Sequence, residues 1–149
     1  MRNFLQVLGA LALAALPAAA LEREFADQLI QSAQNVERDA TAVSRVLKTK
    51  GAPADEVKQK IEAMSADVTK LQELVNQFDA THPALSARDK ADWELVKTKV
   101  QVLEIFHERK KALASEDVAK HRSMLRAFAD GVAQRAKRLQ QTAATLRRG

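Results

Sequence analysis

The sequence lacks several residue types on which whole classes of function depend. It contains no cysteine and no tyrosine, and only four glycines and three prolines among its 149 residues. The absence of cysteine excludes disulfide bonds, thiol catalysis and thiolate metal ligands. No glycine-rich loop able to bind a phosphate is present, and no serine, histidine and aspartate lie in a recognisable nucleophile motif. The sequence therefore predicts that the protein is not an enzyme.

The first 20 residues have the pattern of a secretion signal. A positive charge at Arg2 is followed by an apolar stretch over residues 4–16 and by small residues up to Ala20. The apolar stretch is shorter than the roughly 20 residues that a membrane-spanning helix requires, whereas signal peptides are this short. Residues 1–20 are thus predicted to be a signal peptide that is cleaved after Ala20. Residues 21–149 would then form a single soluble domain in the periplasm or in the external medium.

The remaining sequence carries four apolar stripes in which steps of three and four residues alternate. This spacing predicts helices that pack with coiled-coil-like geometry. The first two stripes comprise Ala26, Leu29, Ala33, Val36, Ala40, Val43 and Leu47, then Ala54, Val57, Ile61, Met64, Val68, Leu71, Val75 and Phe78. The last two comprise Trp93, Val96, Val100 and Leu103, widened by Leu95, Val102 and Phe106, then Ala129, Val132, Ala136, Leu139, Ala143 and Leu146.

The breaks between the stripes predict helices over residues 22–50, 53–79, 86–114 and 116–147. Gly51 is a typical residue after a helix end, and Pro53 is favoured in a first helical turn. His82-Pro83 breaks the chain a second time, and Ser86 with Asp89 resembles a capping box. Helices of similar length joined by short loops predict an all-α, antiparallel up-down-up-down four-helix bundle.

The third break, near Ser115, is the weakest because it contains neither glycine nor proline. The alternative fold is therefore a long helical hairpin in which the third and fourth helices are fused. The bundle makes one prediction that separates the two. It places Phe25, Phe78 and Trp93 at the same end, where they would form an aromatic layer.

Positive charge is concentrated at the C-terminal end. Residues 118–149 contain eight lysines and arginines against one aspartate, whereas residues 21–117 contain 15 against 18 acidic residues. Candidate partner-binding residues are Arg122, Arg126, Arg135 and Arg138. They predict an acidic protein or an anionic membrane surface as the partner, or acidic residues of the chain's own other helices. Nucleic acid is not expected because no aromatic residues alternate with these cations. A homo-oligomer is also compatible with the sequence.

Four further residues are candidate metal ligands, namely Met64, His107, His121 and Met124. If the chain turns near Ser115, the two histidines are at similar distances from the turn on antiparallel helices. Imidazole and thioether groups suit copper(I) or haem iron, and bundle cores hold such groups in other proteins. The usual explanation, two structural histidines at the edge of an apolar stripe, requires no metal. No cofactor is predicted.

Two functional hypotheses follow from the sequence. The first is an exported, non-enzymatic bundle that acts by binding or scaffolding through its surface, in the manner of a chaperone. The second is a small periplasmic metal- or haem-binding four-helix bundle.

Overall fold

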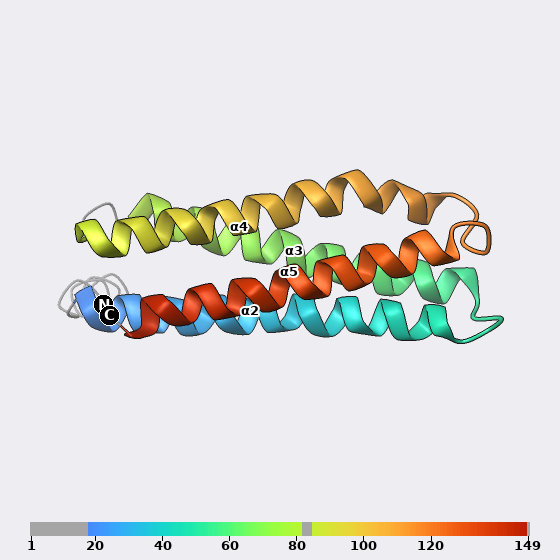
Figure 1. The fold of residues 1–149 in the computed structure, drawn as a ribbon, viewed down its shortest axis with the longest axis horizontal. Helices are drawn as coiled ribbons and strands as arrows, with labels where there is room; N and C mark the ends of the chain where they lie inside the picture. The colour runs from blue at the N-terminus through green and yellow to red at the C-terminus, as the bar shows by residue number, and fades with distance from the viewer. Residues whose placement is uncertain (1–17, 82–84, 149) are drawn as a thin grey trace, which may run out of the picture.

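The computed structural model describes residues 18–81 and 85–148, and within them it forms four long helices and no strand. The helices are α2 (Ala18–Lys48), α3 (Ala54–Thr81), α4 (Ala87–Lys111) and α5 (Arg122–Arg148), with a short 3-10 helix, η1 (Ala112–Ser115), after α4. Successive helices run in opposite directions, as Figure 1 shows. The predicted antiparallel four-helix bundle is therefore confirmed. Most of the predicted signal peptide and the break at His82-Pro83 lie outside the described residues.

The alternative fold with a fused third and fourth helix is wrong. The chain turns back after η1 (Figure 1), and α5 begins at Arg122 instead of at residue 116 as predicted. Before it, the Asp117 carboxylate accepts hydrogen bonds from the backbone N–H groups of Ala119 and Lys120 at 3.0 and 3.3 Å, and the His121 N–H donates to the Asp117 carbonyl at 3.1 Å. This acidic residue thus stabilises a turn in the loop and not the first turn of α5.

The other two helix boundaries follow the predicted chemistry. Gly51 adopts a φ of 78°, a conformation that other residues rarely take, and lies three residues beyond the end of α2. The Ser86 hydroxyl oxygen accepts a hydrogen bond from the Asp89 N–H at 3.2 Å, and the hydroxyl donates to the Asp89 carboxylate at 2.6 Å. Ser86 thus caps the start of α4 as expected, although the Asp89 carboxylate binds the Ser86 hydroxyl, where a capping box uses the backbone N–H of the cap residue.

The helices form a four-sided arrangement in which α2 contacts α3 and α5, and α4 contacts the same two helices. Packing is most extensive between α2 and α5 and least extensive between α3 and α4. Alanine occupies every seventh position of the buried stripe in both α2 and α5, and these alanines are fully buried: Ala26, Ala33, Ala40, Ala129, Ala136 and Ala143. Small side chains let the two helix backbones approach closely, because the distance between packed helices depends on the residues at the contact.

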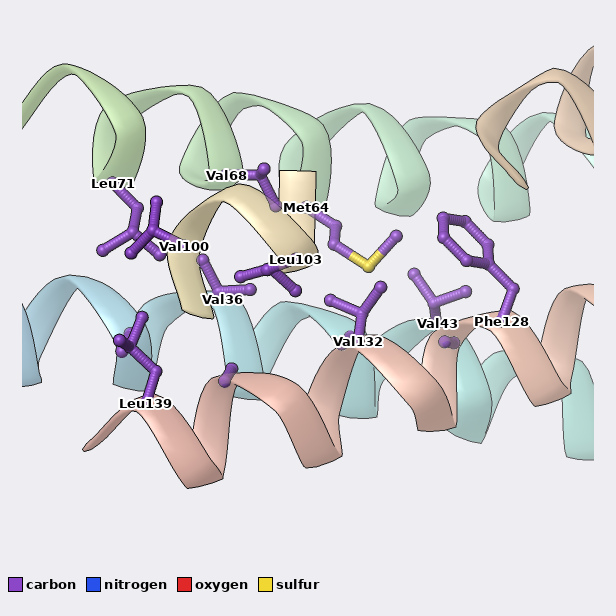
Figure 2. Packing of buried hydrophobic residues seen from close by; sticks show 14 of the residues in the cluster. Val36, Val43, Met64, Val68, Leu71, Val100, Leu103, Phe128, Val132 and Leu139 are labelled. Carbon is purple, nitrogen blue, oxygen red and sulfur yellow. The ribbon is translucent and has the colours of Figure 1, made fainter. Parts of the chain in front are cut away.

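Larger residues fill the core on the α3 and α4 side. The buried stripes of these two helices contain aliphatic, aromatic, methionine and histidine residues but no alanine. Figure 2 shows Met64 of α3 extending into the space around Val43, Val132 and Phe128. The core is thus closely packed along one side of the bundle and filled by bulky side chains along the other.

The predicted aromatic layer is confirmed. The rings of Phe25 and Phe78 stack with centroids 4.0 Å apart, and Trp93 meets them edge-on at 5.3 and 4.7 Å. The indole N–H of Trp93 donates to the Asp79 carboxylate at 2.9 Å, so its polar atom is satisfied. This layer joins α2, α3 and α4 at one end of the bundle.

Replacing Phe78 by alanine should remove the centre of this layer. Phe78 is only 5% exposed, so the substitution should lower the free energy of unfolding by about 3–5 kcal/mol, the usual cost of a large cavity. Urea denaturation followed by circular dichroism measures this change. The half-exposed Val102 supplies a control, since Val102→Ala should change stability by less than about 0.5 kcal/mol. A loss below about 1 kcal/mol for Phe78→Ala would contradict the layer.

Candidate binding surface on α4 and α5

Helix α4 presents apolar residues on two faces. Its core face contains Trp93, Val96, Val100 and Leu103, all of them buried. Leu95, Val102 and Ile105 lie on the outer face and are 49%, 48% and 43% exposed. The prediction that Leu95 and Val102 widen the core stripe is therefore wrong. Because each residue advances about 100° around a helix, these side chains lie outside the core face of α4.

A groove runs between this outer face and α5. It has a volume of about 410 Å³ and is lined by Leu95, Thr98, Lys99, Val102, Gln134, Arg135 and Arg138. We call these residues together with Ile105 the α4–α5 face. It combines aliphatic side chains on α4 with cationic and amide side chains, most of which come from α5. The arrangement is suited to a ligand that is itself both apolar and anionic.

A close contact between α4 and α5 fixes one edge of the groove. A Cβ atom at Gly131 would lie 2.8 Å from the Phe106 ring, so glycine is required for this ring to lie against α5. The Arg135 guanidinium lies over the same ring, 3.8 Å from its centroid, and donates to the Gly131 carbonyl at 3.2 Å. Stacking and hydrogen bonding thus hold the Arg135 side chain in place while leaving further N–H groups free to bind a partner.

The cations of the α4–α5 face are not paired with carboxylates. Within residues 18–81 and 85–148, no ion pair involves Lys99, Arg135 or Arg138, whereas Arg147 at the end of α5 pairs with Asp27 of α2 at 3.2 Å. The interpretation that the basic segment is neutralised by the other helices therefore does not extend to this groove.

The four arginines that the sequence singled out lie in different surroundings. Arg122 donates to the Leu47 carbonyl at 2.6 Å and also to the Thr49 carbonyl, so its guanidinium caps the end of α2. Arg126 is exposed and lies about 120° around α5 from Arg138, away from the groove. Arg135 and Arg138 both line the groove. The geometry thus brings two of the four candidates together.

The four candidate metal ligands also lie in different parts of the structure. Met64 and His107 are buried in the core, and the His107 Nε2 atom lies 2.9 Å from the Ser65 hydroxyl oxygen of α3. His107 Nδ1 is buried and has no hydrogen-bond partner among the described residues, while the nearest carboxylate oxygen, on Glu108, is 3.8 Å away. Sequence reasoning missed Ser65, because the pairing joins residues 42 positions apart.

His121 and Met124 lie elsewhere. His121 occupies the turn before α5, where its Nε2 is 2.6 Å from the Glu116 carboxylate, and Met124 is 50% exposed. The turn spans the residues between η1 and Arg122, so the argument that both histidines are equidistant from Ser115 no longer applies. The described residues contain no group of three or more histidine, aspartate or glutamate side chains placed to hold a metal ion. The assignment of these four residues as ligands stays a prediction.

The buried His107 makes stability depend on pH. Burial lowers the pKa of this imidazole below its usual 6.5, with a smaller lowering from Lys111 and an opposing effect from Glu108. The folded protein therefore holds the ring neutral at a pH at which the unfolded chain already binds a proton. This contribution to stability is present above about pH 6.5 and is lost as the pH falls below it.

Substitution of His107 by glutamine should remove this dependence. Between about pH 7.5 and 5.5 the unfolding free energy of the wild type should fall more steeply than that of His107→Gln, by at most about 1.4 kcal/mol per pH unit. Urea denaturation at several pH values gives both slopes. Equal slopes for the wild type and His107→Gln would refute the role of the buried imidazole.

Comparisons with known proteins identify no relative of this chain. It matches no family model, and no curated protein or solved structure is significantly similar to it. Among the described residues, no helix is long and apolar enough to cross a membrane. The feature that bears on function is thus the α4–α5 face.

Proposed function

We propose that the protein is exported and acts without catalysis, by binding another macromolecule through the α4–α5 face. The observation that supports this proposal is the presence of half-exposed Leu95, Val102 and Ile105 beside a groove with three cations that have no carboxylate partner in the part of the chain that the structure describes. Apolar residues gathered on one exposed face often mark an interaction site. Charge on one side of such a face would orient the partner.

The apolar residues of the α4–α5 face would supply only part of the free energy of binding a partner. Full burial of an aliphatic side chain contributes about 1.5–3 kcal/mol, and these three are already half-buried, so covering them would supply roughly 2–4 kcal/mol. That gain is offset by the entropy lost on association. Lys99, Arg135 and Arg138 are therefore needed as well, and binding should weaken as salt concentration rises. Such a role resembles that of a chaperone, because the protein would bind another macromolecule without catalysing a reaction.

Export is supported by the N-terminal sequence, in which a basic residue, an apolar stretch and small residues follow one another. The absence of cysteine is compatible with an oxidising compartment, since the fold depends on no thiol. We therefore place the binding function in the periplasm or outside the cell.

The absence of cysteine also provides the test, because a single introduced cysteine is a unique label. In cells that export the protein, the cysteine of Val102→Cys should react with N-ethylmaleimide about tenfold more slowly than in the purified protein. This is the slowing expected if a partner covers the face in about nine-tenths of the molecules. Gln101→Cys is the matched control, because residue 101 is exposed on the same helix but points about 100° away. Equal rates in cells and in vitro for Val102→Cys would refute the proposal.

A further inference from the structure

We propose that the α4–α5 face binds an acidic amphipathic helix of a different protein. This inference rests on the proposed function and adds the chemistry of the partner. Three observations carry it, namely the spacing of the exposed apolar residues, the position of the unpaired cations beside them and the placement of the aromatic side chains.

The exposed stripe has the spacing of a helix-packing seam. Leu95, Thr98, Val102 and Ile105 follow one another in steps of three, four and three residues along α4. This alternation matches that of the stripes with which the four helices pack in the core. The ten steps from Leu95 to Ile105 along the helix cover about 15 Å, the length of about three helical turns. A helix with apolar residues at the same spacing would pack along this stripe.

The charges indicate which side of that helix is acidic. Arg135 and Arg138 are one turn apart on α5, and Lys99 lies on the α5 side of the stripe on α4. Carboxylates spaced three or four residues apart along one flank of the bound helix would meet these cations. Arg135 is already held against Phe106, so its guanidinium would lose less conformational entropy on binding.

The same charges disfavour a second copy of this chain. Two copies that packed α4 against α4 would pair Leu95 with Ile105, but would also bring together six cations from the two grooves. Like charges placed together at an interface are destabilising.

A membrane surface is disfavoured by the aromatic residues. Membrane-binding proteins place tryptophan and tyrosine at the lipid interface. Here Trp93, Phe25 and Phe78 are buried in the core layer, and Phe106 lies beneath Arg135.

A synthetic peptide tests the inference directly. The probe is an 18-residue fluorescein-labelled helix with leucines on one face and glutamates along one flank, and its control has the same composition in scrambled order. Fluorescence anisotropy should show saturable binding of the patterned peptide that weakens between about 0.05 and 0.5 M salt. The scrambled peptide should bind at least about tenfold more weakly.

Two variants with the same change in net charge locate the site. Arg138→Glu should weaken binding of the patterned peptide about tenfold or more, whereas Arg126→Glu should leave it near the wild-type value. Both residues are exposed, so circular dichroism should show both variants folded. Lys99→Glu, on the other side of the groove, should reproduce the effect of Arg138→Glu.

Several results would overturn the inference. If the two peptides bind equally well, or if both arginine variants lose the same affinity for the patterned peptide, the attraction depends on net charge alone. Binding to vesicles of phosphatidylglycerol without binding to the peptide would identify a lipid surface instead. A dimer in sedimentation that Val102→Glu abolishes would identify a second copy. If the peptide fails but Val102→Cys is protected in cells, the partner class is wrong and the proposed function stands.

Discussion

The close approach of α2 and α5 determines how the other two helices fill the core. Alanine at regular seven-residue intervals in their buried stripes lets α2 and α5 pack closely against each other and thereby closes the bundle. The bulk of the core must then come from α3 and α4, which supply Met64, Phe78, Trp93 and other large side chains. A bundle built this way is asymmetric, and its least extensive contact is between α3 and α4.

This asymmetry explains why α4 has an exposed apolar face. Its core side is fixed by large residues, and its contact with α5 depends on the Phe106 ring, for which Gly131 leaves room. Leu95, Val102 and Ile105 are then left half-exposed on this surface. The same contact positions Arg135 over Phe106 at the edge of the groove. The contact between Phe106 and α5 thus accounts both for the exposed apolar residues and for the fixed position of Arg135.

Much of the fold could be predicted because it depends on local sequence patterns. Apolar spacing, Gly51 and the Ser86 cap indicated the helices, and the topology implied the meeting of Phe25, Phe78 and Trp93. The predictions for the start of α5 and for the position of Leu95 were wrong, because in each case the local sequence is compatible with two structures. Asp117 suits a helix start or a loop turn and takes the second, while Leu95 lies close enough to the core stripe to be assigned to it. Long-range partners were also missed, because no pattern links Arg122 to the carbonyls that end α2, or Ser65 to His107.

Photo-crosslinking in cells tests most directly whether α4 lies against a protein partner, as we propose. With p-benzoylphenylalanine at position 102, irradiation of exporting cells should yield one discrete protein adduct, and Arg138→Glu should reduce its yield. The same amino acid at position 101, which faces about 100° away on α4, should give no such adduct. The absence of an adduct at 102, or the same adducts from both positions, would contradict the account.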